Sequence, residues 1–354
     1  TNNYQMSFLK QFGGKITKSL KEKYSNSSQW DGAKFFNLEE TTMNISFQDM
    51  PGLLRKQLCG RSDRAPKGPL TVEKIDLETF TSHSDVPKAI WYGHSALCLR
   101  INDKTILIDP MLGPNASPIA PFATKRFSEN TLSIIDELPA IDILMYSHDH
   151  YDHIDYDSFK RLSAKINKYF VALGVGRHLV KWGVDPDKIT EFDWWQNAEI
   201  GDLKITFTPS RHFSGRGVSD RAKSMWGGWV FTTPKHNIYF SGDGGYGSHF
   251  KEIGKQLGPF DFGFIECGQY NELWHAIHMY PEEAAQAAID AGVKVAMPVH
   301  WGAFSLAMHH WKEPIDRFIA EAKIKNLDVV TPSLGLIFDL ESKGKENYWW
   351  REVE

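Results

Sequence analysis

The chain has 354 residues, a formal net charge of −4, and ordinary proportions of hydrophobic (42%) and charged (24%) residues. These values exclude a disordered, collagenous or coiled-coil chain and predict one large domain or two ordinary ones. The near-neutral charge gives no electrostatic reason to bind nucleic acid, so no nucleic-acid partner is expected. The three cysteines stand far apart, which favours neither a disulfide framework nor a thiolate metal site.

The first 70 residues lack strand patterning and end in a stretch that contains Gly and Pro. We interpret residues 1–70 as a partly helical N-terminal extension and residues 71–354 as the main domain. Four apolar residues of the extension recur at helical spacing among lysines: Leu9, Phe12, Ile16 and Leu20. This pattern predicts a basic amphipathic helix, interrupted at Gly13 and Gly14. Such a helix either docks on its own domain or lies on an anionic membrane, which leaves a peripheral membrane contact open.

The sequence contains no membrane-spanning segment by its hydropathy. Its longest stretch without Asp, Glu, Lys or Arg, Val295 to Trp311, includes three His, a Pro and a Gly. Because the sequence begins at Thr1 rather than Met, removal of a signal peptide stays open, and the compartment is not predicted.

From about residue 89 the pattern changes to short apolar strands that alternate with turns and helical stretches. Strands are predicted at residues 89–92, 96–101, 105–108, 141–147, 204–208, 229–232, 237–241, 262–266 and 293–299. The clearest helix runs from Pro281 to Ala291, with Pro in the first turn and Gly292 after its end. Strands mixed with helices indicate a layered fold of the α/β or α+β class.

Four metal-binding side chains follow the predicted strand at residues 141–147, in the segment His148-Asp-His-Tyr-Asp-His153. His148 and His150 are two residues apart, so in an extended loop they point to the same side and can share one ion. Asp152 and His153 can address a second ion after a turn. A lone His is usually a structural residue with a hydrogen-bond partner, but this concentration of ligands predicts metal binding.

Further ligands are needed, because each zinc takes about four or five donors. Three candidates stand just beyond the ends of predicted strands: His212, Asp243 and His300. Two ions about 3.5 to 4 Å apart, bridged by a carboxylate and a hydroxide, form the arrangement used for two-metal hydrolysis. Zinc suits His and Asp donors best, although iron and manganese accept them too.

These residues, in this order, resemble the metallo-β-lactamase superfamily, whose fold is a four-layer αββα sandwich with a metal site at one edge. Over about residues 88–335 the chain more specifically resembles the N-acyl-phosphatidylethanolamine-hydrolysing phospholipase D subfamily. The motifs that carry this likeness are Trp91-Tyr-Gly-His-Ser95, Ile108-Asp-Pro110, Ala116-Ser-Pro118, Lys125-Arg126, Asp193-Trp-Trp195, Ser241-Gly-Asp-Gly-Gly-Tyr246, Gly258-Pro-Phe-Asp261, His278-Met-Tyr-Pro-Glu-Glu283 and His300-Trp-Gly-Ala-Phe304. Gly244 departs from the family, which usually has Thr there, and residues 1–70 show no matching motif.

The resemblance implies a binuclear zinc hydrolase. It assigns His148, His150 and His212 to one zinc, Asp152, His153 and His300 to the other, and Asp243 to a bridge between them. A hydroxide that bridges the zincs would attack phosphorus, releasing N-acylethanolamine and phosphatidic acid from a phospholipid substrate. Asp152 and His278 are the implied catalytic residues, with His278 near the reacting phosphate or the leaving group.

Two other functions stay open. One is a related hydrolase of a small soluble substrate, a sugar-phosphate lactone or a phosphodiester, which needs no deep apolar cavity beside the metals. The other is a membrane-associated binding module with structural metals, although structural zinc sites are usually closed and often use Cys.

Four further side chains are candidates for substrate contacts. Trp274 and Trp301 adjoin the site histidines in the sequence, and we expect them near the substrate. Arg126 and Arg211 are weaker candidates, because a guanidinium binds phosphate well but is more often a surface ion-pair partner.

Overall fold

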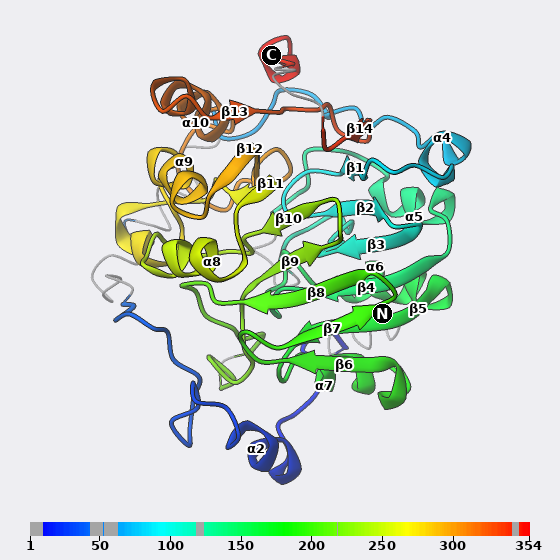
Figure 1. Ribbon diagram of the computed structural model, residues 1–354, viewed down its shortest axis with the longest axis vertical. Coiled ribbons are helices and arrows are strands. Elements are labelled where there is room, and N and C mark those ends of the chain that lie inside the picture. The colour runs from blue at the N-terminus through cyan, green and yellow to red at the C-terminus, as the bar shows by residue number, and fades with distance from the viewer. Residues whose placement is uncertain (1–9, 43–51, 53–62, 118–123, 218, 342–346) are drawn as a thin grey trace.

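Two mixed β-sheets of seven strands each form the centre of the protein (Figure 1). The computed structural model describes residues 10–42, 52, 63–117, 124–217, 219–341 and 347–354. The first sheet has the order β14-β1-β2-β3-β4-β5-β6, in which β14 to β3 pair antiparallel and β3 to β6 pair parallel. Its strands are β1 (Lys88–Trp91), β2 (Leu97–Ile101), β3 (Lys104–Ile108), β4 (Ile141–Tyr146), β5 (Ile166–Ala172), β6 (Ile189–Phe192) and β14 (Ile337–Asp339).

The second sheet repeats this plan with the order β13-β12-β11-β10-β9-β8-β7. Strands β7 to β10 pair antiparallel, and β10 to β13 pair parallel. Its strands are β7 (Asn197–Ile200), β8 (Leu203–Thr208), β9 (Gly228–Thr232), β10 (Asn237–Phe240), β11 (Phe260–Glu266), β12 (Val293–Val299) and β13 (Asp328–Val329). The nine predicted strands are all present, with ends displaced by two residues at most.

Helices cover the outer faces of both sheets and complete the four layers of an αββα sandwich. Figure 1 shows α8, α9 and α10 on one side of the paired sheets and α5 and α6 on the other. The helices are α2 (Lys18–Tyr24), α4 (Leu77–Thr81), α5 (Ile134–Glu137), α6 (Tyr156–Leu162), α7 (Gly176–Lys181), α8 (His249–Leu257), α9 (Pro281–Asp290) and α10 (Glu313–Ile324), with 3₁₀ turns at Thr131–Ser133, Ser163–Lys165, Pro186–Lys188, Glu272–Ile277 and Trp349–Arg351. The predicted mixed fold with an αββα sandwich is therefore confirmed.

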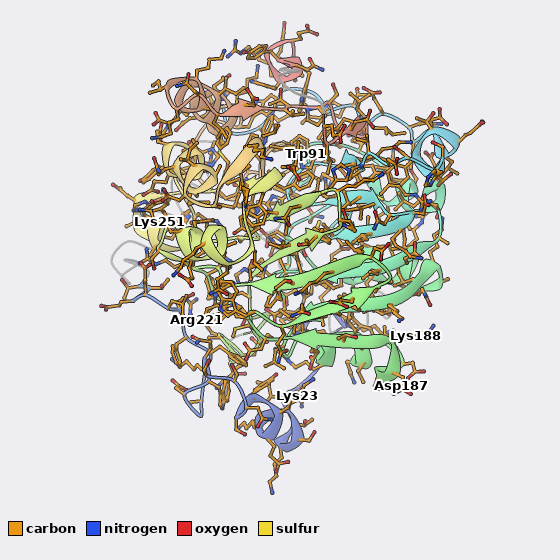
Figure 2. All side chains as sticks on the ribbon, viewed as in Figure 1. Lys23, Trp91, Asp187, Lys188, Arg221 and Lys251 are labelled. Carbon is orange, nitrogen blue, oxygen red and sulfur yellow. The ribbon has the colours of Figure 1, made fainter. Side chains whose placement is uncertain are left out.

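Side chains fill the space between the sheets, where Trp91 lies (Figure 2). Strands such as β4 and β11 read as nearly continuous apolar runs because the sheets cover one face and the helices cover the other. Leu144 and Phe264, one from each sheet, are fully buried and belong to the same core cluster. At about 25 cal/mol per Å² of apolar surface, burial on this scale is the main stabilising contribution.

The N-terminal segment packs against the main domain. Helix α2 begins at Lys18 with the Thr17 side chain as its N-cap, so Gly13 and Gly14 precede the helix rather than interrupt it. Ile16 and Leu20 pack on the core, and Tyr24 is fully buried. Leu9 of the predicted amphipathic helix lies outside the described residues. Within the described ranges, no helix combines the length and the apolar character needed to cross a bilayer.

Candidate metal centre

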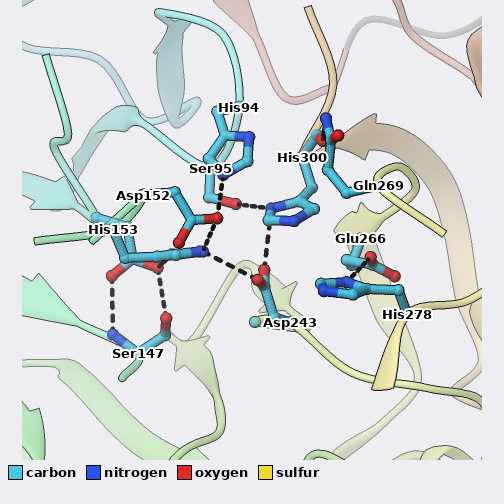
Figure 3. Close-up of polar contacts among 12 residues, drawn as sticks. His94, Ser95, Ser147, Asp152, His153, Asp243, Glu266, Gln269, His278 and His300 are labelled. Atoms are coloured by element: carbon cyan, nitrogen blue, oxygen red, sulfur yellow. Dashed lines mark hydrogen bonds and ion pairs between the residues drawn. The ribbon is translucent and has the colours of Figure 1, made fainter. Parts of the chain in front are cut away.

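The predicted metal-binding residues meet at one edge of the sandwich, where strands of both sheets end. Strand β4 ends at Tyr146, just before the His148–His153 segment. Strands β10 and β12 end just before Asp243 and His300. Ligands commonly bind beyond the carboxyl ends of parallel strands, because loops from several strands converge there. Figure 3 shows Asp152 and His153 from the first sheet facing Asp243 and His300 from the second.

Three histidines form the first group, and their ring nitrogens converge. The His148 Nε2 lies 2.9 Å from the His150 Nδ1, and the His212 Nε2 lies 3.1 Å from the same atom. The far nitrogens are held in place, since the His148 Nδ1 contacts the Ser147 hydroxyl at 2.9 Å and the His212 Nδ1 donates to the Ile277 carbonyl at 3.0 Å. Such contacts orient the rings for an ion.

The second group consists of His153, Asp152 and His300. The His153 Nε2 lies 2.9 Å from the Asp243 Oδ2 and 3.7 Å from the Asp152 Oδ2. The His300 Nδ1 lies 3.1 Å from the Asp243 Oδ1. Asp243 also lies 4.0 Å from the His148 Nε2 of the first group. Its carboxylate therefore stands between the two groups.

The chemistry of these donors fits metal ions. Burial lowers the pKa of His150 to about 4 and holds the pKa values of His148 and His212 well below the usual range. These rings are therefore neutral near pH 7, which is the form that binds a metal. The His300 Nε2 is buried and makes no hydrogen bond. Converging His and Asp donors with a buried nitrogen that lacks a partner fit metal binding.

The sequence reasoning missed two residues that orient these donors. Asp109 is fully buried, and its Oδ2 lies 2.8 Å from the His153 Nδ1. The same carboxylate accepts hydrogen bonds from the Ser147 amide and hydroxyl. His94 contacts the Asp152 Oδ2 through its Nε2 at 3.0 Å, and its ring centroid lies 3.9 Å from that of His300. Asp109 follows a predicted strand, so the reasoning used for the other ligands would have found it.

Three residues of the centre adopt the left-handed backbone region that normally favours glycine: His94 (φ 54°), Asp109 (φ 42°) and His300 (φ 71°). Such a conformation costs about 1 to 3 kcal/mol per residue and persists only where surrounding contacts enforce it. Here the His94 amide donates to the Trp301 carbonyl at 2.7 Å and the His300 amide donates to the His94 carbonyl at 2.9 Å. The backbone thus fixes both rings toward the second group.

His278 lies at the open side of the centre. Its side chain is 13% exposed, and its ring centroid lies 5.1 Å from that of His212 and 5.2 Å from that of His300. The Glu266 Oε1, at the end of β11, lies 2.9 Å from the His278 Nδ1. This contact orients the ring, with the Nε2 on the side away from Glu266. The strand-end reasoning also missed Glu266.

The structure corrects one predicted substrate contact. Trp301 is 2% exposed, packs against Trp91 and Trp350, and donates its Nε1 hydrogen to the Pro298 carbonyl. It has no surface for a substrate, because the loop after β12 turns this side chain into the core. Trp274 is half-buried and stays a predicted contact.

The two candidate phosphate contacts have other partners. Arg126 is buried and donates to the backbone carbonyls of Gly113 and Tyr92. Arg211 donates to the carbonyls of Glu40 and Tyr246. Both guanidinium groups therefore hold backbone segments together.

Comparison with known proteins identifies this arrangement. A family model described as a beta-lactamase superfamily domain matches residues 104–301. The chain belongs to this superfamily. It is 37% identical over 326 residues to an uncharacterized protein of Mycobacterium tuberculosis, covering 91% of this chain and 86% of that one. It is 30% identical over 292 residues to N-acyl-phosphatidylethanolamine-hydrolyzing phospholipase D 1 of Caenorhabditis elegans, covering 77% and 81%.

Solved structures agree on the fold. Igni18, a metallo hydrolase from Ignicoccus hospitalis, aligns with a TM-score of 0.55 at 20% identity, covering 72% of this chain and 98% of that one. This likeness concerns the fold alone. The family match and the relatives identify the protein as a metal-dependent hydrolase of the metallo-β-lactamase superfamily. Its His and Asp side chains form a potential metal cluster.

Proposed function

We propose that this hydrolase is a binuclear zinc phosphodiesterase of the phospholipase D type, which cleaves N-acyl-phosphatidylethanolamine to N-acylethanolamine and phosphatidic acid. The observation that carries the proposal is the position of Asp243 between two groups of donor atoms, with His278 at the open side. The likeness to the phospholipase D of Caenorhabditis elegans supports the choice of substrate.

The donor groups divide between two ions. His148, His150 and His212 would hold one ion, Asp152, His153 and His300 the other, and Asp243 would contact both. Two bound ions would supply a nucleophile from water at neutral pH and neutralise the phosphodiester charge. His and Asp donors suit zinc, and iron or manganese also fits them.

His278 and Asp152 move protons in this proposal. Water supplies the oxygen that phosphorus gains, and its proton leaves to solvent past Asp152, the partly exposed carboxylate of the centre. The bond between phosphorus and the ethanolamine oxygen breaks, and that oxygen takes a proton from the His278 Nε2. Glu266, whose pKa burial raises, holds the ring by its contact with the His278 Nδ1 and returns a proton to that nitrogen. A positioned general acid of this kind contributes about 10² to 10⁴ in rate.

A lipid substrate requires an apolar surface near the centre, and the N-terminal segment offers one. Phe36 and Leu38 are 45% and 52% exposed. Asn37, which lies between them, donates its Nδ2 hydrogen to the His212 carbonyl at 2.8 Å and accepts from the His212 amide at 3.1 Å. We assign the peripheral membrane contact to these two side chains rather than to α2, whose apolar residues pack on the core.

The test is hydrolysis of N-acyl-phosphatidylethanolamine in mixed micelles by zinc-loaded protein, with products identified by mass spectrometry. Lactones and soluble phosphodiesters are assayed in parallel. His150→Ala should abolish the reaction, while His83→Ala, at a 79% exposed side chain, should leave it unchanged. Activity only on the soluble substrates would replace the lipid assignment with the small-substrate alternative. Metal-replete protein that folds and binds lipid but hydrolyses nothing would favour the binding module.

A further inference from the structure

Three side chains connect the N-terminal segment to the loop that carries His148 and His150: His178, Arg177 and Arg216. Asp149, between His148 and His150, is fully buried, and its carboxylate is bonded to residues of other elements. These contacts are the Ser224 Oγ at 2.7 Å, the Gly215 amide at 2.7 Å, the His178 Nε2 at 3.1 Å and the Arg177 Nη2 at 3.4 Å. Asp149 therefore anchors the loop that carries two of the proposed ligands.

One histidine ring connects this anchor to the N-terminal segment. The Gly14 amide donates to the His178 Nδ1 at 3.1 Å, so the proton of the neutral ring sits on Nε2 and is donated to Asp149. The neighbouring Arg177 donates from its Nε to the Gly14 carbonyl at 3.2 Å. The amide and the carbonyl of Gly14 are thus bound by His178 and Arg177, and both of these side chains also contact the Asp149 carboxylate.

A second connection runs through Arg216, which is 3% exposed. Its Nε donates to the Gln11 carbonyl at 2.9 Å. Its Nη1 donates to the carbonyls of Asp149 at 2.9 Å and Ile154 at 2.7 Å. Arg216 therefore links Gln11 to both ends of the segment that contains the four clustered candidate ligands.

The Gly13-Gly14 pair is required by this contact. Gly13 has φ +68°, and a Cβ there would lie 2.0 Å from the His178 Nδ1. A Cβ at Gly14 would lie 2.1 Å from the Arg177 carbonyl oxygen. Only glycine allows so close an approach, so the two residues are explained by docking on α7.

We propose that residues 10–14, here called the N-terminal clasp, position the metal-binding loop. The clasp acts through His178 and Arg216 on Asp149, and so sets the placement of His148 and His150. Contacts behind a metal ligand commonly change metal affinity by 10-fold to 100-fold when removed. The inference rests on the proposed metal centre. The metal content of the parent protein is therefore measured first, and metal binding by the variants is then compared with it.

Gly13→Ala tests the clasp, with Gly32→Ala as its matched control. Gly32 has φ +96°, but a Cβ added there would meet nothing within 4 Å, so its variant carries a comparable backbone cost without the clash. We expect Gly13→Ala to weaken zinc affinity about 10-fold to 100-fold and to shift the visible absorption of the Co²⁺ form. Gly32→Ala should change neither. Folded Gly13→Ala with parental affinity and spectrum would overturn the proposal.

The histidine connection is tested separately. His178→Leu should reproduce the effect of Gly13→Ala, and His178→Gln, which keeps one donor and one acceptor, should restore part of the affinity.

Amide hydrogen exchange in the parent protein tests the clasp without any substitution, so it remains informative if the variants do not fold. Because coupling is reciprocal, metal removal should speed exchange in residues 10–24 as well as 148–154, but not in α10. Exchange that rises in the loop alone would refute the clasp. A parent chain that binds no metal would instead refute the metal centre.

Discussion

Replacing Asp109 by Asn tests whether metal binding depends on the orientation that Asp109 gives to the His153 ring. Asp109 accepts from the Ser147 amide at 2.8 Å and the Ser147 hydroxyl at 2.5 Å, and it contacts the His153 Nδ1 at 2.8 Å. An Asn of the same shape has one oxygen. If that oxygen faces the Ser147 amide, the new NH₂ meets the N–H of His153. The ring must then move its proton to Nε2, which removes the lone pair that faces Asp243.

The alternative amide orientation leaves the Ser147 amide unpaired, and an unpaired buried donor costs about 1 to 3 kcal/mol. We therefore expect Asp109→Asn to lower zinc affinity about 10-fold to 100-fold, or about 1.4 to 2.8 kcal/mol. The assay is bound zinc per chain over a series of buffered free-zinc concentrations. Asp142→Asn is the control, because Asp142 accepts a backbone hydrogen bond from Thr105 away from the centre. Equal zinc retention by Asp109→Asn and the parent would refute the reasoning.

Three further results are expected. Glu266→Gln should lower kcat about 10-fold to 100-fold with KM and metal content unchanged, measured with the lipid substrate, because it disturbs the His278 Nδ1 contact. Burial lowers the pKa of His249 to about 4. Between pH 6.5 and 4, therefore, His249 takes up a proton only in the unfolded chain, and the free energy of unfolding decreases as the pH is lowered. His249→Phe should lessen that slope by up to about 1.4 kcal/mol per pH unit in urea unfolding. Chelation should lower Tm by several degrees, since metal at 100 times Kd stabilises by about 2.7 kcal/mol. An unchanged Tm would count against tight binding.

A separate expectation concerns the lipid surface. Phe36→Ser combined with Leu38→Ser should weaken binding to phospholipid vesicles, measured by co-sedimentation, because both exposed side chains flank Asn37 at the centre. Val180→Ser is the control, since Val180 is equally exposed, at 45%, but lies on α7. Equal vesicle binding by the double variant and the parent would remove the assignment of the membrane contact.

The strands that the sequence predicted are those buried on both faces. Apart from the half-buried Asp142, strand β4 is an apolar run because sheet and helices cover it, and its pattern is visible in six residues. In strand β5 the exposed pair Asn167 and Lys168 follows the first residue and shortens the apolar run to four residues, and the edge strand β7 alternates exposed and half-buried residues. Exposed polar positions shorten or remove the apolar signal, which explains why β5 and β7 were not predicted.

The cluster of candidate ligands was predictable to the extent that its members are local in sequence. His148 to His153 share one loop, and the strand-end rule located Asp243 and His300. The partners of residues that act through a neighbour could not be predicted, because these contacts depend on which strands lie side by side. Asp109 reaches His153 only because β3 pairs with β4 in parallel register. The clasp residues Gly13 and Gly14 were predicted as a break in a helix, since nothing in the sequence indicates their contact with α7.

The charges of the centre connect metal binding to the stability of the fold. Asp109, Asp243 and Glu266 are all at most 2% exposed, and Asp152 is 16% exposed. Burial raises the pKa of Asp243, and burial together with Asp243 raises the pKa of Glu266. Among the surrounding rings, His153 has a raised pKa and lowers the pKa of Asp152, while His148, His212 and His300 are neutral, so the positive charge that the protein supplies is small. Two divalent ions would supply the missing positive charge, so the centre and the edge of both sheets are stabilised together when the metals bind.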